Sequence, residues 1–398
     1  MRIKNKNKPS DGKFAGKKVL LIDGGSRQVL PMIKGFSRQG CEVSVYCSSK
    51  LDVGYVYKYT DKKVMGVFDP HDTEGTYSGI RAAIERGGYD LVVPMNDYAA
   101  TLLARHREEL SRFAYIAVNS PEIFDLAADK QKTMQICMDN DIPCPKTAVF
   151  SDISEFSDEG WSYPLVIKPR SGYGANGFNT VENREELNRL FVLTEQKFGE
   201  SLVQEYIPQT SSQYQVEMVM GRDGECKSFV LMDKLRWYPI NGGSSTINVT
   251  LKDEKIKNDC VRLLKALGWV GYASLDLIRD PRDGVAKILE INPRINGTAK
   301  ICFKCGVDLA LQLLEEAAGG EITEIADYQS GVYLRYVHMD VMWFLKSKNR
   351  FSAKPSFFSF KNTVDEIFSW EDLKPFFVYS ITAVKKLISD KKKRSLEK

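Results

Sequence analysis

The chain has 398 residues, of which 43% are hydrophobic and 27% are charged, and its formal net charge is +4. This balance is typical of a globular protein with two or three domains, and the lack of an 18-residue apolar run excludes a membrane span. The first 18 residues are basic and polar, so we expect no secretory signal. Eight scattered cysteines indicate reduced thiols in a cytoplasmic protein, and only three histidines argue against histidine-based catalysis.

Positive charge is concentrated at the two ends of the chain. Residues 1–18 carry seven Lys or Arg and one acid, and residues 346–398 carry thirteen and six, so the body between them is acidic. Basic tails of this kind usually keep a protein in solution, and they can also touch an anionic surface. The acidic body and the lack of a recognisable module disfavour nucleic acid as a partner.

Residues 18–120 alternate strand-like and helix-like segments, which is typical of a doubly wound α/β domain. Gly24-Gly25 ends the first strand, but a complete GxGxxG nucleotide motif is missing there. The apolar patterns predict strands over residues 18–23, 42–46, 64–68, 89–94 and 115–118.

Residues 121–145 predict one helix that carries Lys130 and ends near Pro143. Two strands that flank a glycine loop follow within residues 164–182. The remaining pattern predicts strands over 201–206, 213–220, 226–233 and 246–250, helices over 184–198, 254–267 and 306–318, and a hairpin between the last two helices.

The expected hairpin brings oxygen ligands together. Glu290 and Asn292 lie two residues apart in a strand, so they share a face, and Arg294 follows them. A turn around Asp283 predicts that Asp276 lies opposite Glu290. Two carboxylates and a carboxamide beside a cation suit Mg²⁺ and phosphate. A solvated hairpin is the alternative, and it is disfavoured because Ile278 and Ile288 would share the carboxylates' face.

The loop Gly172 to Gly177 matches GxGxxG by letters, but it precedes a strand rather than a helix, which argues against a dinucleotide site. A glycine loop between two strands can instead cover the phosphates of ATP, and a plain hairpin turn is the alternative. Lys168 precedes this loop, whereas the corresponding lysine of a protein kinase follows it.

The order of these features resembles the ATP-grasp superfamily. The features are the Lys168 strand, the glycine loop, the strand with Gln204-Glu205-Tyr206-Ile207, and the hairpin with Asp276, Glu290 and Asn292. The pattern is most similar to the carboxylate–amine ligase and carbamoyl-phosphate-synthase-like branch. The resemblance implies an α/β and α+β fold with a basic tail (1–17), a doubly wound pre-ATP-grasp domain (18–120), an ATP-grasp domain (121–325, with a lid at about 145–202) and an aromatic and basic C-terminal extension (326–398).

The resemblance also implies an ATP site. Lys130 and Lys168 would reach the phosphates, and Arg294 would face the phosphoryl group in transfer, so Arg294 and Lys168 are the catalytic candidates. The flap and the adenine rim would be formed by Ser171, Gly172, Gly174 and Gly177 and by Glu205, Tyr206 and Ile207. Gln213 would contact the ribose, with Glu217 as the alternative. One or two Mg²⁺ ions, or Mn²⁺, would bind Asp276, Glu290 and Asn292.

The activity implied by the resemblance is ATP-dependent joining of a small-molecule carboxylate to an amine through an acyl-phosphate. Thioester formation, bicarbonate or carbamoyl-phosphate-type chemistry, and a non-catalytic ATP-binding module stay open, and a homodimer is compatible with all of them. The acceptor contacts implied by chain order are Lys234, Arg236, Gly243 and Ser244, for which an ordinary charged strand and turn is the alternative.

The C-terminal extension contains an amphipathic pattern. Phe377, Ile381, Val384 and Ile388 fall at i, i+4, i+7 and i+11, which predicts one apolar stripe on a helix with a basic end. Such a helix either docks on the body of the protein or makes peripheral contact with a membrane surface.

Overall fold

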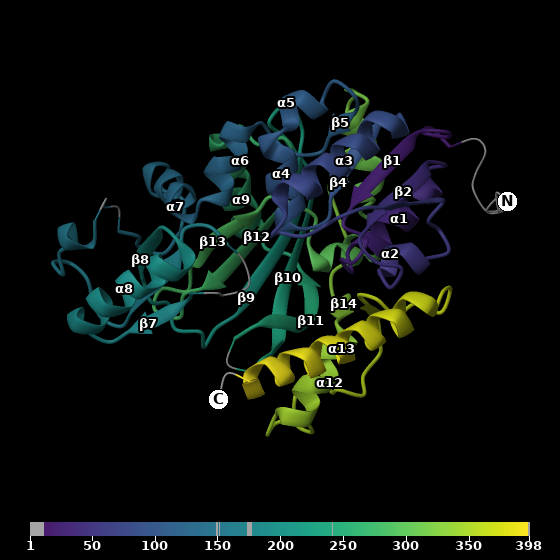
Figure 1. Cartoon of the computed structure of the whole chain (residues 1–398). Coiled ribbons are helices and arrows are strands. Elements are labelled where there is room, and N and C mark those ends of the chain that lie inside the picture. Colours follow the sequence, from purple (N-terminus) through teal and green to yellow (C-terminus); the bar gives the residue numbers. More distant parts are fainter. Residues whose placement is uncertain (1–11, 149, 151, 173–176, 241, 397–398) are drawn as a thin grey trace.

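The computed structural model of the chain describes residues 12–148, 150, 152–172, 177–240 and 242–396. Three β-sheets organise the described part, and helices cover them (Figure 1). Among the described residues, no helix is long and apolar enough to cross a membrane.

The first domain is built on a parallel sheet of five strands in the order β3-β2-β1-β4-β5. Successive residues of β1 point to opposite faces, so Val19 and Leu21 enter the core beneath α1, while Leu20 and Ile22 enter the core beneath α3 and α4. The doubly wound prediction is therefore confirmed. The elements are β1 (Lys18–Ile22), α1 (Val29–Arg38), β2 (Glu42–Cys47), α2 (Val53–Val56), β3 (Lys62–Met65), α3 (Thr73–Gly87), β4 (Leu91–Pro94), α4 (Asp97–Arg105), α5 (Arg107–Leu110) and β5 (Tyr115–Ile116).

The prediction of a single helix over residues 121–145 is wrong. Two helices, α6 (Pro121–Ala128) and α7 (Lys130–Asp139), occupy this segment. Asp129 between them has an extended backbone, and its carboxylate accepts hydrogen bonds from the amides of Gln131 and Lys132. This carboxylate caps the new helix by satisfying amides that have no partner inside it. Lys130 consequently begins α7 instead of lying inside a longer helix.

A small sheet in the order β7-β6-β8 has its own hydrophobic core. Leu165, Ile167 and Val203 pack there against Phe191 of the covering helix α8. The glycine loop connects the adjacent strands β6 and β7, as the sequence predicts. The elements are β6 (Leu165–Pro169), β7 (Asn179–Val181), α8 (Arg184–Phe198) and β8 (Ser201–Glu205), preceded by the 3₁₀ turn η1 (Ile153–Glu155).

The largest sheet has seven strands in the order β13-β12-β9-β10-β11-β14-β15. The first six pair antiparallel, and β15 joins β14 in parallel. Its elements are β9 (Gln213–Met220), β10 (Cys226–Tyr238), β11 (Ser244–Leu251), α9 (Glu254–Ala266), β12 (Gly271–Arg279), β13 (Ala286–Asn292), η2 (Gly297–Ala299), α10 (Lys300–Lys304), α11 (Leu309–Ala317), β14 (Tyr333–Arg335) and β15 (Thr363–Asp365).

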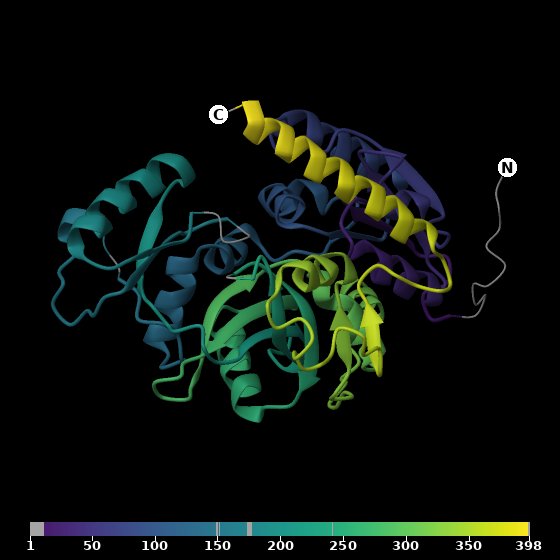
Figure 2. The ribbon, with the colours of Figure 1, turned by 90° about the horizontal axis from the view of Figure 1, so that it is seen from below.

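The C-terminal extension contributes β14, β15, α12 (Val337–Lys346) and α13 (Lys374–Leu396). Of the two placements expected for the last helix, the structure shows docking on the body, since α13 packs against α2 (Figure 2). The face that docks differs from the expected one. Phe376 and Tyr379 pack against the core, whereas Phe377, Ile381 and Val384 are exposed.

Candidate active site

The hairpin of β12 and β13 has the predicted pairing around the carboxylates. Asp276 lies opposite Glu290, and Ser274 lies opposite Asn292. A bulge follows Asp276, so that Leu277 pairs with Ile288. The extra residue in the bulged strand turns Ile288 into the core, and the expectation that Ile288 shares the carboxylates' face is therefore wrong.

Lysines neutralise both carboxylates. Lys234 of β10 forms an ion pair with Asp276, and Lys130 Nζ lies 3.4 Å from Glu290 Oε2. Asn292 Nδ2 donates to Asp276 Oδ2 over 3.0 Å. Two carboxylates and a carboxamide on one sheet end are hard oxygen donors, and this set fits Mg²⁺. Within the described residues no group of three or more His, Cys, Asp or Glu could hold a metal ion, and the set described here has an asparagine as its third donor.

Lys168 of β6 lies beside these groups. The pKa of Lys168 is lowered to about 8. Burial is the largest cause; the nearby cation Lys130 acts in the same direction, and Glu290 acts against it. Lys130 Nζ also donates to the carbonyl oxygen of Gly172 over 2.9 Å. Two lysines from different elements thus converge between the glycine loop and the hairpin.

The described ends of the glycine loop require glycine. Gly172 has φ +118° and Gly177 has φ +76°, a region that side chains with a Cβ rarely adopt. A Cβ at Gly177 would also lie 2.7 Å from Pro169 Cγ. Ser171 and Gly172 are exposed, and Gly174 lies outside the described residues. The loop therefore leaves β6 and enters β7 through two glycine-specific conformations.

Glu205, at the end of β8, belongs to an ion network that the sequence did not indicate. Its carboxylate contacts Arg282 Nη2 at 2.6 Å and Lys287 Nζ at 3.1 Å, and it accepts from the amide of Lys146 at 2.9 Å. Burial raises the pKa of Glu205, but the Lys146 amide and the two cations outweigh burial and lower it. Tyr206 follows this carboxylate directly.

The other expected nucleotide contacts differ in accessibility. Ile207 is buried, and the side chain of Gln213 contacts Gln209 at 3.5 Å. Gln213 pairs with Lys234 across the strands, so it shares the face that carries Asp276. Glu217 is enclosed, because its carboxylate accepts hydrogen bonds from Tyr272 and Thr298. Gln213, rather than Glu217, therefore lies at the open end of this face.

Arg294 joins the hairpin to the first domain. Its Nη2 donates to Asn292 Oδ1 over 3.2 Å, and its Nε donates to Asp97 Oδ1 over 3.1 Å. Asp97 is the first residue of α4, and Asn96 before it caps that helix. Sequence reasoning missed Asp97, although its position after the carboxyl end of a parallel strand is a recognised signal for a site.

The expected acceptor contacts separate into two groups. Lys234 reaches the site through Asp276, whereas Arg236 is buried beneath the C-terminal extension. The guanidinium of Arg236 donates to the carbonyl oxygen of Pro355 over 2.9 Å and lies 3.6 Å from Asp340. Gly243 and Ser244 are exposed at the β10–β11 turn. The structure therefore brings only Lys234 of these four to the carboxylates.

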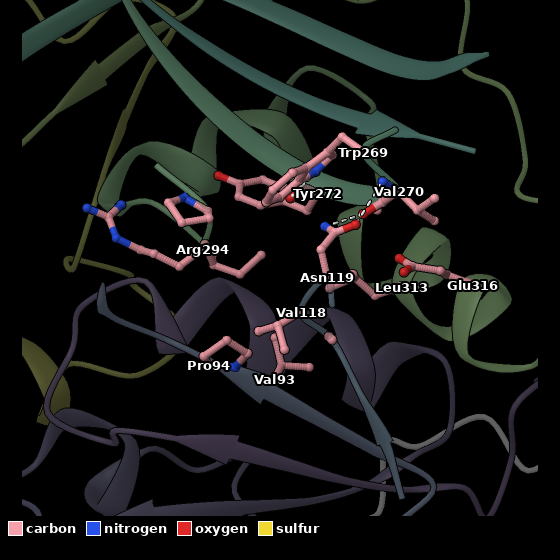
Figure 3. A pocket seen from close by; sticks show the side chains of 14 residues that line it. Val93, Pro94, Val118, Asn119, Trp269, Val270, Tyr272, Arg294, Leu313 and Glu316 are labelled. Atoms are coloured by element: carbon pink, nitrogen blue, oxygen red, sulfur yellow. Dashed lines mark hydrogen bonds between the residues drawn. The ribbon is translucent and has the colours of Figure 1, made fainter. Parts of the chain in front are cut away.

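A small pocket lies between the first sheet and the start of β12 (Figure 3). Arg294 borders it, together with Val93, Asn119, Tyr272 and Glu316. Its volume of about 20 Å³ accommodates one water molecule. The pocket is therefore too small for a nucleotide.

The chain is similar to known proteins in sequence and in fold. Residues 127–298 match the family model of the ATP-grasp domain. The chain is 24% identical over 323 residues to the D-aspartate ligase of Enterococcus faecium (strain Aus0004), covering 75% of this chain and 76% of that protein. It is 22% identical over 336 residues to the carbamoyl phosphate synthase large chain of Hyperthermus butylicus (strain DSM 5456 / JCM 9403 / PLM1-5), covering 78% of this chain and 31% of that protein.

A solved structure adds a likeness in fold. The biotin carboxylase domain dimer of Hydrogenobacter thermophilus 2-oxoglutarate carboxylase, in complex with MgADP, ADP and bicarbonate, superposes with a TM-score of 0.68 at 19% identity. The superposition covers 80% of this chain and 73% of that chain. At 80% of this chain, the shared fold extends beyond residues 127–298.

Proposed function

We propose that this chain is an ATP-grasp enzyme, an ATP-dependent carboxylate–amine ligase that forms an amide bond and releases ADP and phosphate; the match of residues 127–298 to the ATP-grasp domain and the similarity to a D-aspartate ligase support this. The observation that carries the proposal is the convergence of two lysines with the hairpin carboxylates. Lys130 begins α7, Lys168 lies in β6, and Glu290 lies in β13, yet all three interact. Cations that face carboxylates across an open sheet end are suited to a magnesium–polyphosphate ligand.

The nucleotide would lie between the small sheet and the large sheet. Lys130 and Lys168 would bind the phosphates, and the loop that starts at Ser171 and Gly172 would cover them. Glu205, Tyr206 and Ile207 would border the adenine, and Gln213 would contact the ribose. Backbone amides of such a loop and cations held in place by the fold can stabilise the phosphoryl group in transfer without reorganising at the moment of reaction.

The metal site would consist of Asp276, Glu290 and Asn292, with one or two Mg²⁺ ions, or Mn²⁺, as the expected occupants. When bound, the ion supplies charge neutralisation between the phosphates and the carboxylates. Lys234 holds Asp276 by an ion pair, and Arg294 holds Asn292 by a hydrogen bond. These two contacts fix the orientation of the donor atoms.

The reaction would proceed in two displacements. A carboxylate oxygen of the acid attacks the γ-phosphorus, and ADP leaves with the electron pair of the broken bond. The amine then attacks the acyl carbon, phosphate leaves, and the amine loses a proton. Arg294 would face the developing charge, and its hydrogen bond to Asp97 of the first domain would orient it. No nucleophilic side chain is required for this sequence.

Carboxyphosphate chemistry on bicarbonate is the second candidate function. The match to a carbamoyl phosphate synthase and the fold shared with a biotin carboxylase domain favour it, and both reactions would use the same phosphate and metal contacts. The greater coverage of the D-aspartate ligase supports the amide-forming reaction. We further propose small-molecule substrates and domain limits at residues 1–17, 18–120, 121–325 and 326–398.

The test is ADP release from ATP and Mg²⁺ in the presence of panels of amino acids and other carboxylates. A second arm replaces the acid and amine with bicarbonate and ammonia. We expect ADP release to depend on an acid–amine pair and to fall by at least about a hundredfold in Glu290→Ala. The matched control is Glu254→Ala, which removes an exposed carboxylate of α9. Equal activity of Glu290→Ala and the control would remove the metal assignment, and turnover with bicarbonate alone would select the second candidate.

A further inference from the structure

One side of α13 is fixed to the body of the protein. Tyr379 Oη lies 2.5 Å from Tyr336 Oη, and Ser380 Oγ lies 2.8 Å from His338 Nε2. The rings of Phe376 and His338 have centroids 4.8 Å apart. These contacts set the rotation of the helix about its axis, and its opposite side faces outward (Figure 1).

The outward side is apolar. Phe377, Ile381 and Val384 have relative exposures of 60%, 49% and 54%, and Trp370, just before the helix, is 85% exposed. The three helical residues recur at i, i+4 and i+7, so they form one stripe. We call these three residues and Trp370 the outer stripe. Since the inner contacts prevent rotation, the stripe cannot turn into the core, and its exposure follows from the fold.

The helix that carries the outer stripe is strongly basic. The segment Lys374–Leu396 contains seven Lys or Arg residues and one Asp. A comparison with α8 separates apolar exposure from charge. Val192 and Leu193 of α8 are also exposed, but that helix carries three basic and three acidic residues. Of these two helices, α13 is the one that combines exposed apolar residues with an excess of positive charge.

We propose that α13 is a peripheral membrane contact that rests its outer stripe in the surface of a bilayer containing anionic phospholipids. Apolar and aromatic side chains enter the boundary between headgroups and acyl chains, while the excess positive charge of the segment attracts lipid phosphates. A nucleic acid would use the charge and leave the stripe in water. A second copy would cover the stripe but would bring two strongly basic helices together, which opposes pairing. An anionic lipid surface satisfies both features at once.

The experiment is cosedimentation of the full chain with vesicles of phosphatidylcholine alone and of phosphatidylcholine mixed with phosphatidylglycerol. We expect binding to the mixed vesicles to be at least about tenfold stronger and to weaken with added salt. The variant Phe377→Ser/Ile381→Ser/Val384→Ser should lose at least about tenfold of this binding. The matched control, Val192→Ser/Leu193→Ser on α8, should bind as the original chain does.

A second variant keeps the test decisive if the serine variant unfolds. Lys385→Glu/Lys386→Glu should weaken binding to the mixed vesicles and leave any weak binding to phosphatidylcholine unchanged. Equal binding of the original chain to both vesicle types, or no binding to either, would overturn the proposal. Sedimentation velocity supplies the third readout: a dimer that disappears in the serine variant, with no vesicle binding, would identify the outer stripe as a contact between copies. Vesicle binding does not require ligase activity, so the two proposals fail independently.

Discussion

The affinity for ATP should fall as the pH rises through about 8, because Lys168 then loses its proton. Burial lowers the pKa of this lysine to about 8, with opposing contributions from Glu290 and Lys130. A protonated Lys168 attracts a phosphate oxygen, whereas the neutral amine does not. The contribution of Lys168 is therefore fully present below this pKa and is lost above it.

The size of the effect follows from the protonated fraction. With a pKa of about 8, Lys168 is about nine-tenths protonated at about pH 7 and about one-tenth protonated at about pH 9. If only the protonated form binds a phosphate oxygen, the apparent Kd rises about tenfold across this interval, or about 1.4 kcal/mol. Bound polyphosphate would in turn raise the pKa of Lys168, since an anion favours the charged amine.

The assay is calorimetric titration of the chain with a non-hydrolysable ATP analogue and Mg²⁺ at several pH values. Lys168→Arg is the matched variant, since a guanidinium stays protonated throughout this range. The Kd of Lys168→Arg should be higher at every pH, because the guanidinium has a different shape from the amine, but it should be nearly independent of pH. A pH-independent Kd in the original chain, or the same slope in Lys168→Arg, would refute the assignment of the titrating group to Lys168.

Two further substitutions test the contacts around the site. Asp97→Asn removes the charged partner of Arg294, so ADP release should slow by about tenfold with little change in the KM for ATP; an equal loss in both quantities would contradict a role in orienting Arg294. Asp340→Asn leaves the buried guanidinium of Arg335 without its anion and should lower the free energy of unfolding by about 3–5 kcal/mol in denaturant titrations. The exposed pair of Asp327 with Lys252 is the control, and its loss should cost less than about 1 kcal/mol.

The register of the hairpin was predictable because its signals are local. A turn at Asp280 to Gly284 and alternation on both strands bring Asp276 opposite Glu290 by counting residues. The bulge beyond this pair could not be predicted by counting residues, because it depends on packing: Ile288 fills the core together with Leu277. The break in the predicted helix at Asp129 did have a local signal, because aspartate is a preferred N-cap residue. The helical pattern on both sides of it concealed this signal.

Contacts between distant residues set the rest of the site, and no local pattern reveals them. Glu205 meets Lys287 only because β8 is brought beside the β12–β13 hairpin, 82 residues further along the chain. Strand β10 extends to Tyr238, five residues beyond its predicted end, through a stretch that carries Lys234 and Arg236. Those charges have partners: Lys234 faces Asp276, and Arg236 faces Asp340. Polar residues in a strand are uninformative until the groups that face them are known.

The hydrogen bond between Arg294 and Asp97 connects the candidate site to the first domain. Asp97 lies outside residues 127–298, and Asn96 beside it donates to Asp23 Oδ2 over 2.6 Å at the end of β1. Asp23 in turn accepts from the amide of Gly25 over 2.9 Å. Hydrogen bonds therefore run from the loop after β1, through the start of α4, to the arginine that faces the reacting phosphate in our proposal. Because each contact fixes the next side chain, a shift of the first domain would displace Arg294, which in our proposal would slow phosphoryl transfer.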